Sequence, residues 1–271
     1  MDFAEIAGRG LVLLGCGRMG SAMLDGWLKG GLPAEAVWVK DPHPSDWLKA
    51  QGVHVNADMP PAPAIVVIAV KPQMMTEALP SISDLGGGAT LFISVAAGTL
   101  LAKFEEILGA NTPIVRAMPN TPAAIGRGIT AIVGNAKVSA AELDQADALL
   151  QAVGETVRLE SEAQMDAVTG VSGSGPAYVF LMIEAMAAAG VAQGLPADLA
   201  MRLAKATMAG AGALALPHDA DPAQLRINVT SPAGTTAAAL EVLMDGAEGL
   251  PPLMEKAVAA AAARSKELSR G

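Results

Sequence analysis

Short apolar runs alternate with longer segments of helical spacing through the first 160 residues of the chain. Each run is rich in Val, Ile and Leu and stops at Gly, Pro or a polar residue, which is typical of a strand buried in a parallel sheet. Strands that alternate with helices in this way form right-handed crossovers, so we predict a doubly wound parallel sheet with helices on both faces. The expected strands are residues 11–14, 37–39, 53–55, 64–70, 91–97, 114–117, 129–133 and 155–159.

The strand pattern stops after Glu160 and only helical spacing follows. We therefore predict two domains, an α/β domain at residues 1–160 and an all-helical domain at residues 161–271. The first helix of this domain, expected at residues 176–193, is apolar on nearly every side, with Glu184 as its lone charge. Such a helix must be buried on all sides. A partner subunit is expected to supply part of this cover. The expected helices are residues 176–193, 197–216, 222–229, 235–244 and 251–268.

A glycine-rich turn follows the first expected strand. Gly15, Gly17 and Gly20 form G-x-G-x-x-G between Leu11–Leu14 and a segment of helical spacing. In a Rossmann-like fold the first glycine permits the tight turn, the second lets the backbone approach a pyrophosphate, and the third lets helix and strand pack closely. The free N–H groups and the dipole at the helix start attract an anion. The pattern predicts a dinucleotide site in a Rossmann-like domain.

Asp41 ends the second expected strand, 21 residues after Gly20. An acid at this position binds the ribose 2′-hydroxyl and selects NAD, whereas NADP requires a cation or a small polar group. Lys40 is suited to a 2′-phosphate, and an ordinary Asp-Pro turn is a third interpretation. The pattern leaves the choice between NADH and NADPH open.

A second polar turn lies in the helical half, in N-V-T-S-P-A-G-T-T at residues 228–236. Ser231 to Gly234 form the turn, and Thr235 and Thr236 begin the next helix. Free N–H groups and three hydroxyls at a helix start suit a carboxylate. The alternative is a Ser or Thr cap that satisfies only its own helix.

Composition and charge exclude several other classes. The net charge of −9 provides no basic field for nucleic acid or an anionic membrane. Cys16, the single cysteine, is expected to serve packing rather than reaction, and His43, His54 and His218 lack the spacing of metal ligands. The N-terminus lacks the order of a signal peptide, and Pro, Gly or charge is expected to interrupt each apolar stretch before it reaches membrane-spanning length. We therefore expect a soluble, cytoplasmic protein without a metal.

The chain resembles the pyrroline-5-carboxylate reductase family over essentially its full length. The resemblance rests on G-C-G-R-M-G at 15–20, A-V-K-P at 69–72, S-V-A-A-G at 94–98, M-P-N-T-P at 118–122, V-T-G-V-S-G-S-G-P-A-Y at 168–178 and T-S-P-A-G-T-T at 230–236. Two positions depart from the family pattern: Ala233 stands where many members have glycine, and Asp41 stands where members often have Ser, Asn or Arg.

The resemblance implies the residues of the site. Asn120 would lie close to the nicotinamide, Asn228 would reach the cofactor across a subunit boundary, and Thr236 would hydrogen-bond the ring nitrogen of the substrate as the catalytic residue. The expected cofactor-binding residues, with Asp41 included from its position, are Leu14, Gly15, Cys16, Gly17, Arg18, Met19, Asp41, Ala69, Val70, Lys71, Pro72, Ala97, Asn120 and Asn228. The expected substrate-binding residues are Glu162, Ser231, Thr235 and Thr236.

The implied activity is reduction of L-1-pyrroline-5-carboxylate to L-proline by NADPH or NADH, the last step of proline biosynthesis, in a homodimer or a ring of dimers. One alternative is a 3-hydroxy acid dehydrogenase or related imine reductase with Lys71 as general acid. Another is a nucleotide sensor without catalysis. The assembly beyond a dimer, feedback by proline and activity on other cyclic imines stay open.

Overall fold

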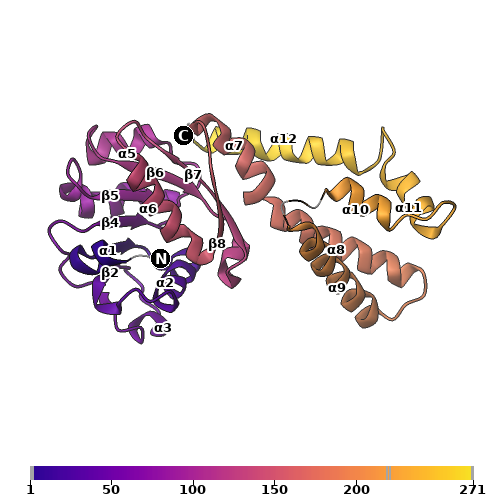
Figure 1. Ribbon diagram of the computed structural model, residues 1–271, viewed down its shortest axis with the longest axis horizontal. Helices are drawn as coiled ribbons and strands as arrows, with labels where there is room; N and C mark the ends of the chain where they lie inside the picture. The colour runs from indigo at the N-terminus through magenta and orange to yellow at the C-terminus, as the bar shows by residue number, and fades with distance from the viewer. Residues whose placement is uncertain (1–2, 218, 220, 270–271) are drawn as a thin grey trace. The chain divides into compact units, whose positions relative to one another are not determined.

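The computed structural model describes residues 3–217, 219 and 221–269; His218 lies outside the described residues. The chain forms two compact units. The first contains the residues up to Gly173 and those from Ala261 on, and the second is Ser174–Ala260 (Figure 1). The first unit thus includes residues 161–173, which lie beyond the domain boundary predicted at residue 160. That boundary stays a prediction.

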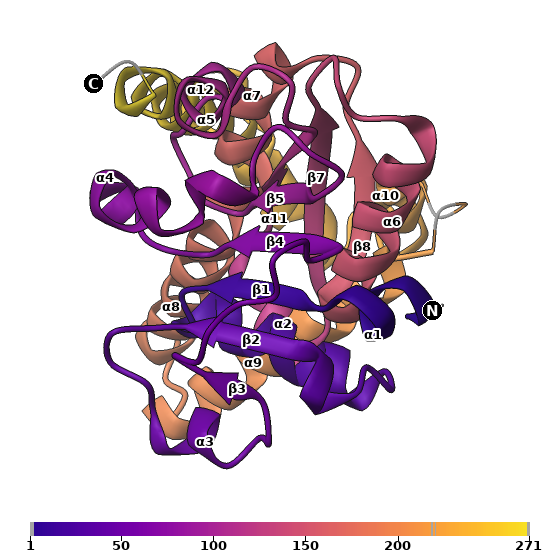
Figure 2. The same ribbon diagram turned by 90° about the vertical axis from the view of Figure 1, so that its left-hand side faces the viewer.

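The first unit contains one eight-stranded sheet in the order β3-β2-β1-β4-β5-β6-β7-β8. Figure 2 shows β3, β2, β1, β4 and β5 side by side in that order. Every expected apolar run forms a strand, and the first six strands are parallel, which confirms the Rossmann-like sheet; the expectation of parallel strands is wrong for the pairing of the seventh with the sixth. The strands are β1 (Leu11–Leu14), β2 (Val37–Lys40), β3 (His54–Val55), β4 (Ile65–Ile68), β5 (Leu91–Ser94), β6 (Ile114–Met118), β7 (Gly128–Gly134) and β8 (Gly154–Arg158).

The last two strands run against the other six. β7 pairs with β6 in antiparallel register, and β8 is parallel to β7. Between β6 and β7 the chain forms only the 3-10 helix η4 (Thr121–Ile125), which is too short for the crossover that a parallel neighbour requires. The helix α6 (Ala140–Leu150) does provide such a crossover, so β8 is parallel to β7.

Helices cover both faces of the sheet, which confirms the doubly wound arrangement. Leu11 and Leu13 of β1 pack toward α1 (Ala4–Arg9), α2 (Arg18–Lys29) and α6. Val12 and Leu14 face α4 (Met75–Ala78), η3 (Leu79–Leu85) and α5 (Leu101–Leu108). This alternation follows the two-residue repeat of a strand. The remaining short helices are η1 (Ala34–Ala36), α3 (Asp46–Lys49), η2 (Pro72–Met74), η5 (Gln151–Val153) and η6 (Glu162–Gln164).

A single long helix, Glu162–Ala192, leads from the first unit into the second. It contains α7 (Met165–Val168), a π turn (Thr169–Gly173) and α8 (Gly175–Ala192). Pro176 lies in the first turn of α8, where its missing N–H removes no helical hydrogen bond. By length and composition alone this helix is apolar enough to cross a membrane. The expectation that every apolar stretch is interrupted is therefore wrong here.

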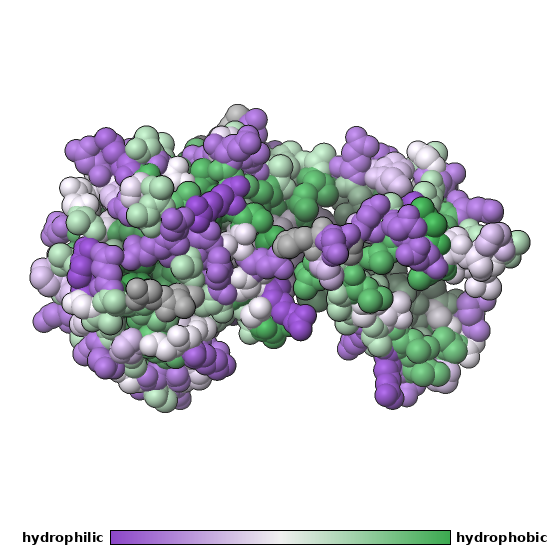
Figure 3. Space-filling view, in the orientation of Figure 1, coloured by the Kyte–Doolittle hydropathy of each residue, from purple (hydrophilic) through white to green (hydrophobic). Residues whose placement is uncertain are grey.

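The second unit contains helices joined by turns, and none of its described residues forms a strand. The expected helices are confirmed to within one residue at each end, and α8 and α9 contact each other closely because Gly190 lies against Ala200. Ala187 is the one residue of α8 that the chain itself buries. Figure 3 shows apolar residues at the surface of this unit. The helices after α8 are α9 (Ala197–Ala215), α10 (Pro222–Asn228), α11 (Thr235–Leu243) and α12 (Leu250–Leu268), and α12 continues into the first unit from Ala261.

Candidate active site

The three glycines between β1 and α2 have the distinct roles that a dinucleotide loop requires. Gly15 has φ +90°, and a Cβ there would lie 2.8 Å from Cγ1 of Val70. A Cβ on Gly20 would collide with the carbonyl oxygen of Gly15. A Cβ on Gly17 would meet no described atom within 4 Å. Packing therefore requires the first and third glycines, while the second leaves open backbone for a ligand to approach.

The start of α2 offers hydrogen-bond donors to an anion. Its N-cap is Gly17, and no described side chain caps the helix. The N–H groups of the first turn point out of the helix without helical partners, and the helix dipole adds partial positive charge. The loop from Leu14 to Met19 thus fits the pyrophosphate of a dinucleotide.

Asp41 lies directly beside this loop. The N–H of Cys16 donates to Oδ2 of Asp41 at 2.7 Å, and the N–H of His43 donates to Oδ1 at 2.8 Å. The Asn56 side chain holds the Asp41 backbone, accepting from its N–H at 3.0 Å and donating to its carbonyl at 2.8 Å. Asp41 and Asn56 line a cavity of about 260 Å³ with Leu14 and Val70. The acid is therefore held beside the glycine loop.

The surroundings of Cys16 disfavour its thiolate. Burial, with the nearby Asp41 carboxylate, raises the pKa of Cys16 to about 11 from 9.0. Both effects disfavour the thiolate, which is the reactive form. The expectation that Cys16 serves packing rather than reaction fits this environment.

We predict that iodoacetamide alkylates Cys16 slowly at pH 8. A pKa near 11 instead of 9.0 leaves about 100-fold less thiolate at that pH, and the rate should rise about tenfold per pH unit toward pH 11. Mass spectrometry of the intact protein measures the rate, and the urea-unfolded chain is the control. Equal rates in the folded and unfolded chain at pH 8 would contradict this prediction.

The other expected cofactor residues of the first unit follow parallel strands. Ala69 to Pro72 follow β4, Ala97 follows β5 and Asn120 follows β6. Parallel strands end at one edge of a sheet, so the fold brings these residues to the edge that carries the glycine loop. Lys71 is exposed there and is the N-cap of η2.

Asn120 is held by two hydrogen bonds within the first unit. Its Oδ1 accepts from the N–H of Ile129 at 3.0 Å, and its Nδ2 donates to the carbonyl of Ser172 at 3.2 Å. Ser172 lies in the π turn, which also packs near Met118, because a Cβ on Gly173 would lie 2.7 Å from its Cε. Asn120 therefore ties the loop after β6 to the π turn.

Glu162 is part of a buried ion pair. Its Oε1 lies 2.7 Å from Nη1 of Arg116, whose side chain is 3% exposed, and accepts from the N–H of Leu101 at 2.9 Å. The pair joins β6, the start of α5 and the start of the long helix. Arg116 was not among the expected site residues. A lone charge inside the apolar run I-V-R-A-M is the signal that could have found it.

The second polar turn forms an uncapped helix start in the second unit. The N-cap of α11 is Gly234, and no described side chain caps this helix. The alternative of a Ser or Thr cap is therefore wrong. Ala233 has φ 57°, in the left-handed region that favours glycine. Thr235 is exposed and Thr236 is half-buried, so the first-turn N–H groups and hydroxyls are available to a carboxylate.

Asn228 and Ser231 belong to the same unit as this turn. Asn228 ends α10 and is exposed, and its Oδ1 accepts from Nε2 of Gln224 at 2.8 Å. Ser231 is exposed, and its carbonyl accepts from the N–H of Gly234 at 3.0 Å. Asn228, Ser231, Thr235 and Thr236 thus lie together in the second unit, and the other expected site residues lie in the first.

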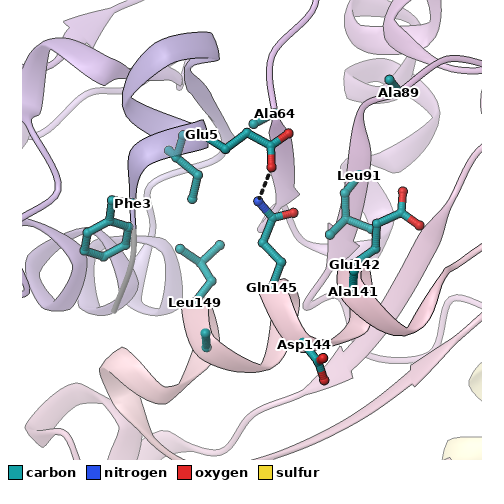
Figure 4. Close-up of a pocket in the computed structure, with 12 residues that line it drawn as sticks. Phe3, Glu5, Ala64, Ala89, Leu91, Ala141, Glu142, Asp144, Gln145 and Leu149 are labelled. Carbon is teal, nitrogen blue, oxygen red and sulfur yellow. Dashed lines mark hydrogen bonds between the residues drawn. The ribbon is translucent and has the colours of Figure 1, made fainter.

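A larger cavity of about 390 Å³ lies at the opposite edge of the sheet (Figure 4). Ala64 and Leu91 line it where β4 and β5 begin, and Nε2 of Gln145 donates to Oε2 of Glu5 across it at 3.2 Å. Ligands of open α/β sheets bind at the carboxyl ends of the strands, so this cavity is not the cofactor site. Among residues 3–217, 219 and 221–269, no group of three or more His, Cys, Asp or Glu could hold a metal ion.

Both units of the chain are similar to known proteins. Residues 162–268 match the model for pyrroline-5-carboxylate reductase dimerisation, and residues 10–98 match that for NADP oxidoreductase, coenzyme F420-dependent. The pyrroline-5-carboxylate reductase of Pseudomonas aeruginosa is 41% identical over 265 residues, covering 96% of each chain. The chain belongs to the pyrroline-5-carboxylate reductase family.

Solved structures of pyrroline-5-carboxylate reductases have the same fold. The enzyme from Coxiella burnetii is 35% identical with a TM-score of 0.91, covering 96% of this chain and 98% of that one. The Plasmodium falciparum enzyme with NADP bound is 29% identical with a TM-score of 0.82, covering 97% and 99%. The chain is therefore an NAD(P)-dependent oxidoreductase of the pyrroline-5-carboxylate reductase family, and it forms homo-oligomers.

Proposed function

We propose that this chain reduces L-1-pyrroline-5-carboxylate to L-proline with a hydride from NAD(P)H, as a cytoplasmic enzyme of proline biosynthesis. The observation that supports this most strongly is a pair of uncapped helix starts, one after the glycine loop and one after T-S-P-A-G. The first suits a pyrophosphate and the second a carboxylate. A dinucleotide and a small acid are the reactants of this reduction.

The residues of the first unit would hold the cofactor. The glycine loop binds the pyrophosphate through N–H groups, and Asp41 faces the adenosine ribose. Ala69 to Pro72 and Ala97 line the edge toward the nicotinamide, with Asn120 beside them, and Asn228 of a partner subunit completes this site. The nicotinamide, when bound, supplies the hydride.

The residues of the second unit would hold the substrate. The N–H groups of α11, with Ser231 and Thr235, bind the carboxylate, and the Thr236 hydroxyl hydrogen-bonds the ring nitrogen. The hydride adds to the carbon of the protonated C=N bond, whose π electrons become the lone pair of the amine nitrogen. The Thr236 hydroxyl donates to that lone pair as it forms, so this hydrogen bond strengthens toward the transition state.

No acid–base dyad is required for this reaction. An imine is protonated far more readily than a ketone, so the substrate arrives activated and the protein contributes proximity and orientation. The rival enzyme would reduce a keto acid with Lys71 as general acid. The family match favours the imine.

The test is steady-state kinetics of the purified chain with pyrroline-5-carboxylate and with keto acids, using each cofactor. We expect oxidation of NADH or NADPH and formation of proline only with the imine. Turnover of a keto acid alone would support the dehydrogenase. Cofactor binding without turnover of either substrate would support the sensor.

We also propose that the helical unit forms the interface of a homodimer. Large apolar side chains on α8 are exposed in the single chain, among them Phe180 at 58% and Leu181 at 65%. Exposed apolar patches of this kind mark an interaction surface. The match of residues 162–268 to a dimerisation model favours a second copy over a membrane as the occupant.

Phe180→Glu is expected to dissociate this dimer. Burying a carboxylate at an apolar interface should raise the dissociation constant about 100-fold or more. Light scattering after gel filtration measures the mass, and it also shows whether dimers assemble into a ring. Ile125→Glu, a matched change at an exposed residue of η4, should keep the wild-type mass. A monomeric wild type, or one that binds neutral vesicles, would contradict the proposal.

A further inference from the structure

We infer that this chain prefers NADH to NADPH and that Asp41 is the residue that determines this preference. The inference rests on the proposed function only in that the chain binds a nicotinamide cofactor. Three observations support it: the place of Asp41 at the glycine loop, the contacts that hold its carboxylate, and the charges around the cavity.

Strand pairing places Asp41 at the loop. Lys40 pairs with Leu14 of β1, and the N–H of Gly15 donates to the carbonyl of Lys40 at 2.8 Å. The next residue is Asp41, whose Oδ2 accepts from the N–H of Cys16 at 2.7 Å. The carboxylate is therefore close to the backbone that would bind the pyrophosphate. In a Rossmann-like site the adenosine ribose lies between that backbone and the end of the second strand.

Asp41 is held through both its backbone and its carboxylate. Asn56 hydrogen-bonds both the N–H and the carbonyl of Asp41, and Asn56 itself has φ 55°, a conformation that asparagine tolerates better than most residues. The N–H of His43 donates to Oδ1 at 2.8 Å. A 2′-phosphate could displace the carboxylate only by breaking these contacts. Asp41 is thus unlike a surface aspartate that can swing into solvent.

The chemistry of the held carboxylate discriminates between the two cofactors. Each of its oxygens can accept a further hydrogen bond, and the ribose 2′-hydroxyl of NADH can donate one. A 2′-phosphate is an anion that would meet the carboxylate at close range and gain no donor from it. The charged residues that line the cavity are Lys40, Asp41 and Glu77. Two carboxylates and one cation give the lining a net negative charge, which disfavours a phosphate.

The wild-type protein provides the first test. Dissociation constants of NADH and NADPH, measured by fluorescence titration, should favour NADH by roughly tenfold or more, as expected for one close pair of like charges. The ratio of kcat/KM with pyrroline-5-carboxylate should show the same preference. Equal or tighter binding of NADPH would overturn the inference. Absence of imine reduction with either cofactor would instead overturn the proposed function, because the binding titration does not depend on it.

Two variants identify the residue responsible. Asp41→Asn keeps the shape but removes the charge, and it should reduce the NADH preference roughly 10- to 100-fold. Lys40→Met removes the only cation lining the cavity and should leave NADH preferred. An unchanged ratio in Asp41→Asn, or a larger change in Lys40→Met, would assign the selectivity elsewhere and overturn the role of Asp41. If Asp41→Asn does not fold, the ratio of the NADH and NADPH dissociation constants of the wild-type protein still tests whether NADH is preferred.

Discussion

Replacing Thr236 with alanine is expected to lower kcat roughly 10- to 1000-fold, the effect of losing one positioned hydrogen bond in the transition state. The hydroxyl is proposed to donate to the lone pair that forms on the ring nitrogen, so its hydrogen bond strengthens toward the transition state. The hydroxyl is proposed to contact the substrate and not the cofactor. The dissociation constants of NADH and NADPH should therefore stay unchanged. Stopped-flow or steady-state turnover with pyrroline-5-carboxylate measures the loss.

The structure indicates that this loss is not a folding effect. Thr236 is the second residue of α11, and the cap of that helix is Gly234, so the substitution removes no capping hydrogen bond. Alanine is also a better helix former than threonine. Thr236→Ser keeps the hydroxyl and should retain most activity. Thr230→Ala removes a hydroxyl that donates to the carbonyl of Arg226, and thermal unfolding of this variant shows the effect of losing a structural hydroxyl nearby. A wild-type kcat in Thr236→Ala would exclude Thr236 from the mechanism.

Glu162→Ala is expected to lower the free energy of unfolding by about 3 kcal/mol, because it leaves a buried arginine unpaired. The Arg116 side chain is 3% exposed, whereas that of Glu162 is 26% exposed. Because Glu162 is only partly buried, the expected loss of stability is at the lower end of the range for breaking a buried ion pair. The substitution also removes the acceptor of the Leu101 N–H at the start of α5. Urea unfolding followed by circular dichroism measures the change.

A matched control separates burial from charge. Glu106→Ala breaks the ion pair with Lys103. The side chains of Lys103 and Glu106 are 61% and 65% exposed, and such exposed pairs contribute about 1 kcal/mol or less to the free energy of unfolding. The experiment also tests the implied contact of Glu162 with substrate. A raised KM for pyrroline-5-carboxylate at unchanged stability would show that Glu162 binds substrate directly and would contradict a structural role.

Strands and helices could be predicted because their signals are local. The run Ile65–Ile68 is β-branched, uninterrupted and short, which favours a buried strand over a helix. The last helix begins and ends within a residue of its expected bounds, because alanine-rich sequence favours helix without outside help. The glycine loop could be predicted as well, because G-x-G-x-x-G is a local spacing and the close contact between Gly20 and Gly15 lies within it.

Other features depend on residues far apart in the chain. The π turn is held partly by Asn120, 52 residues before Ser172. The partner of Arg116 is 46 residues away. No periodicity within one segment encodes such pairings, because each depends on where the rest of the sheet brings the other residue.

The sequence by itself determined the elements, the dinucleotide loop and the family, since propensity, burial pattern and short motifs act over a few residues. Only the tertiary structure decided that Asp41 is clamped beside the loop, that Glu162 pairs with a buried arginine, and that Gly234 leaves the start of α11 uncapped. The physical reason is that a hydrogen bond or ion pair is specified by two positions in space. The chain brings those positions together only when it folds.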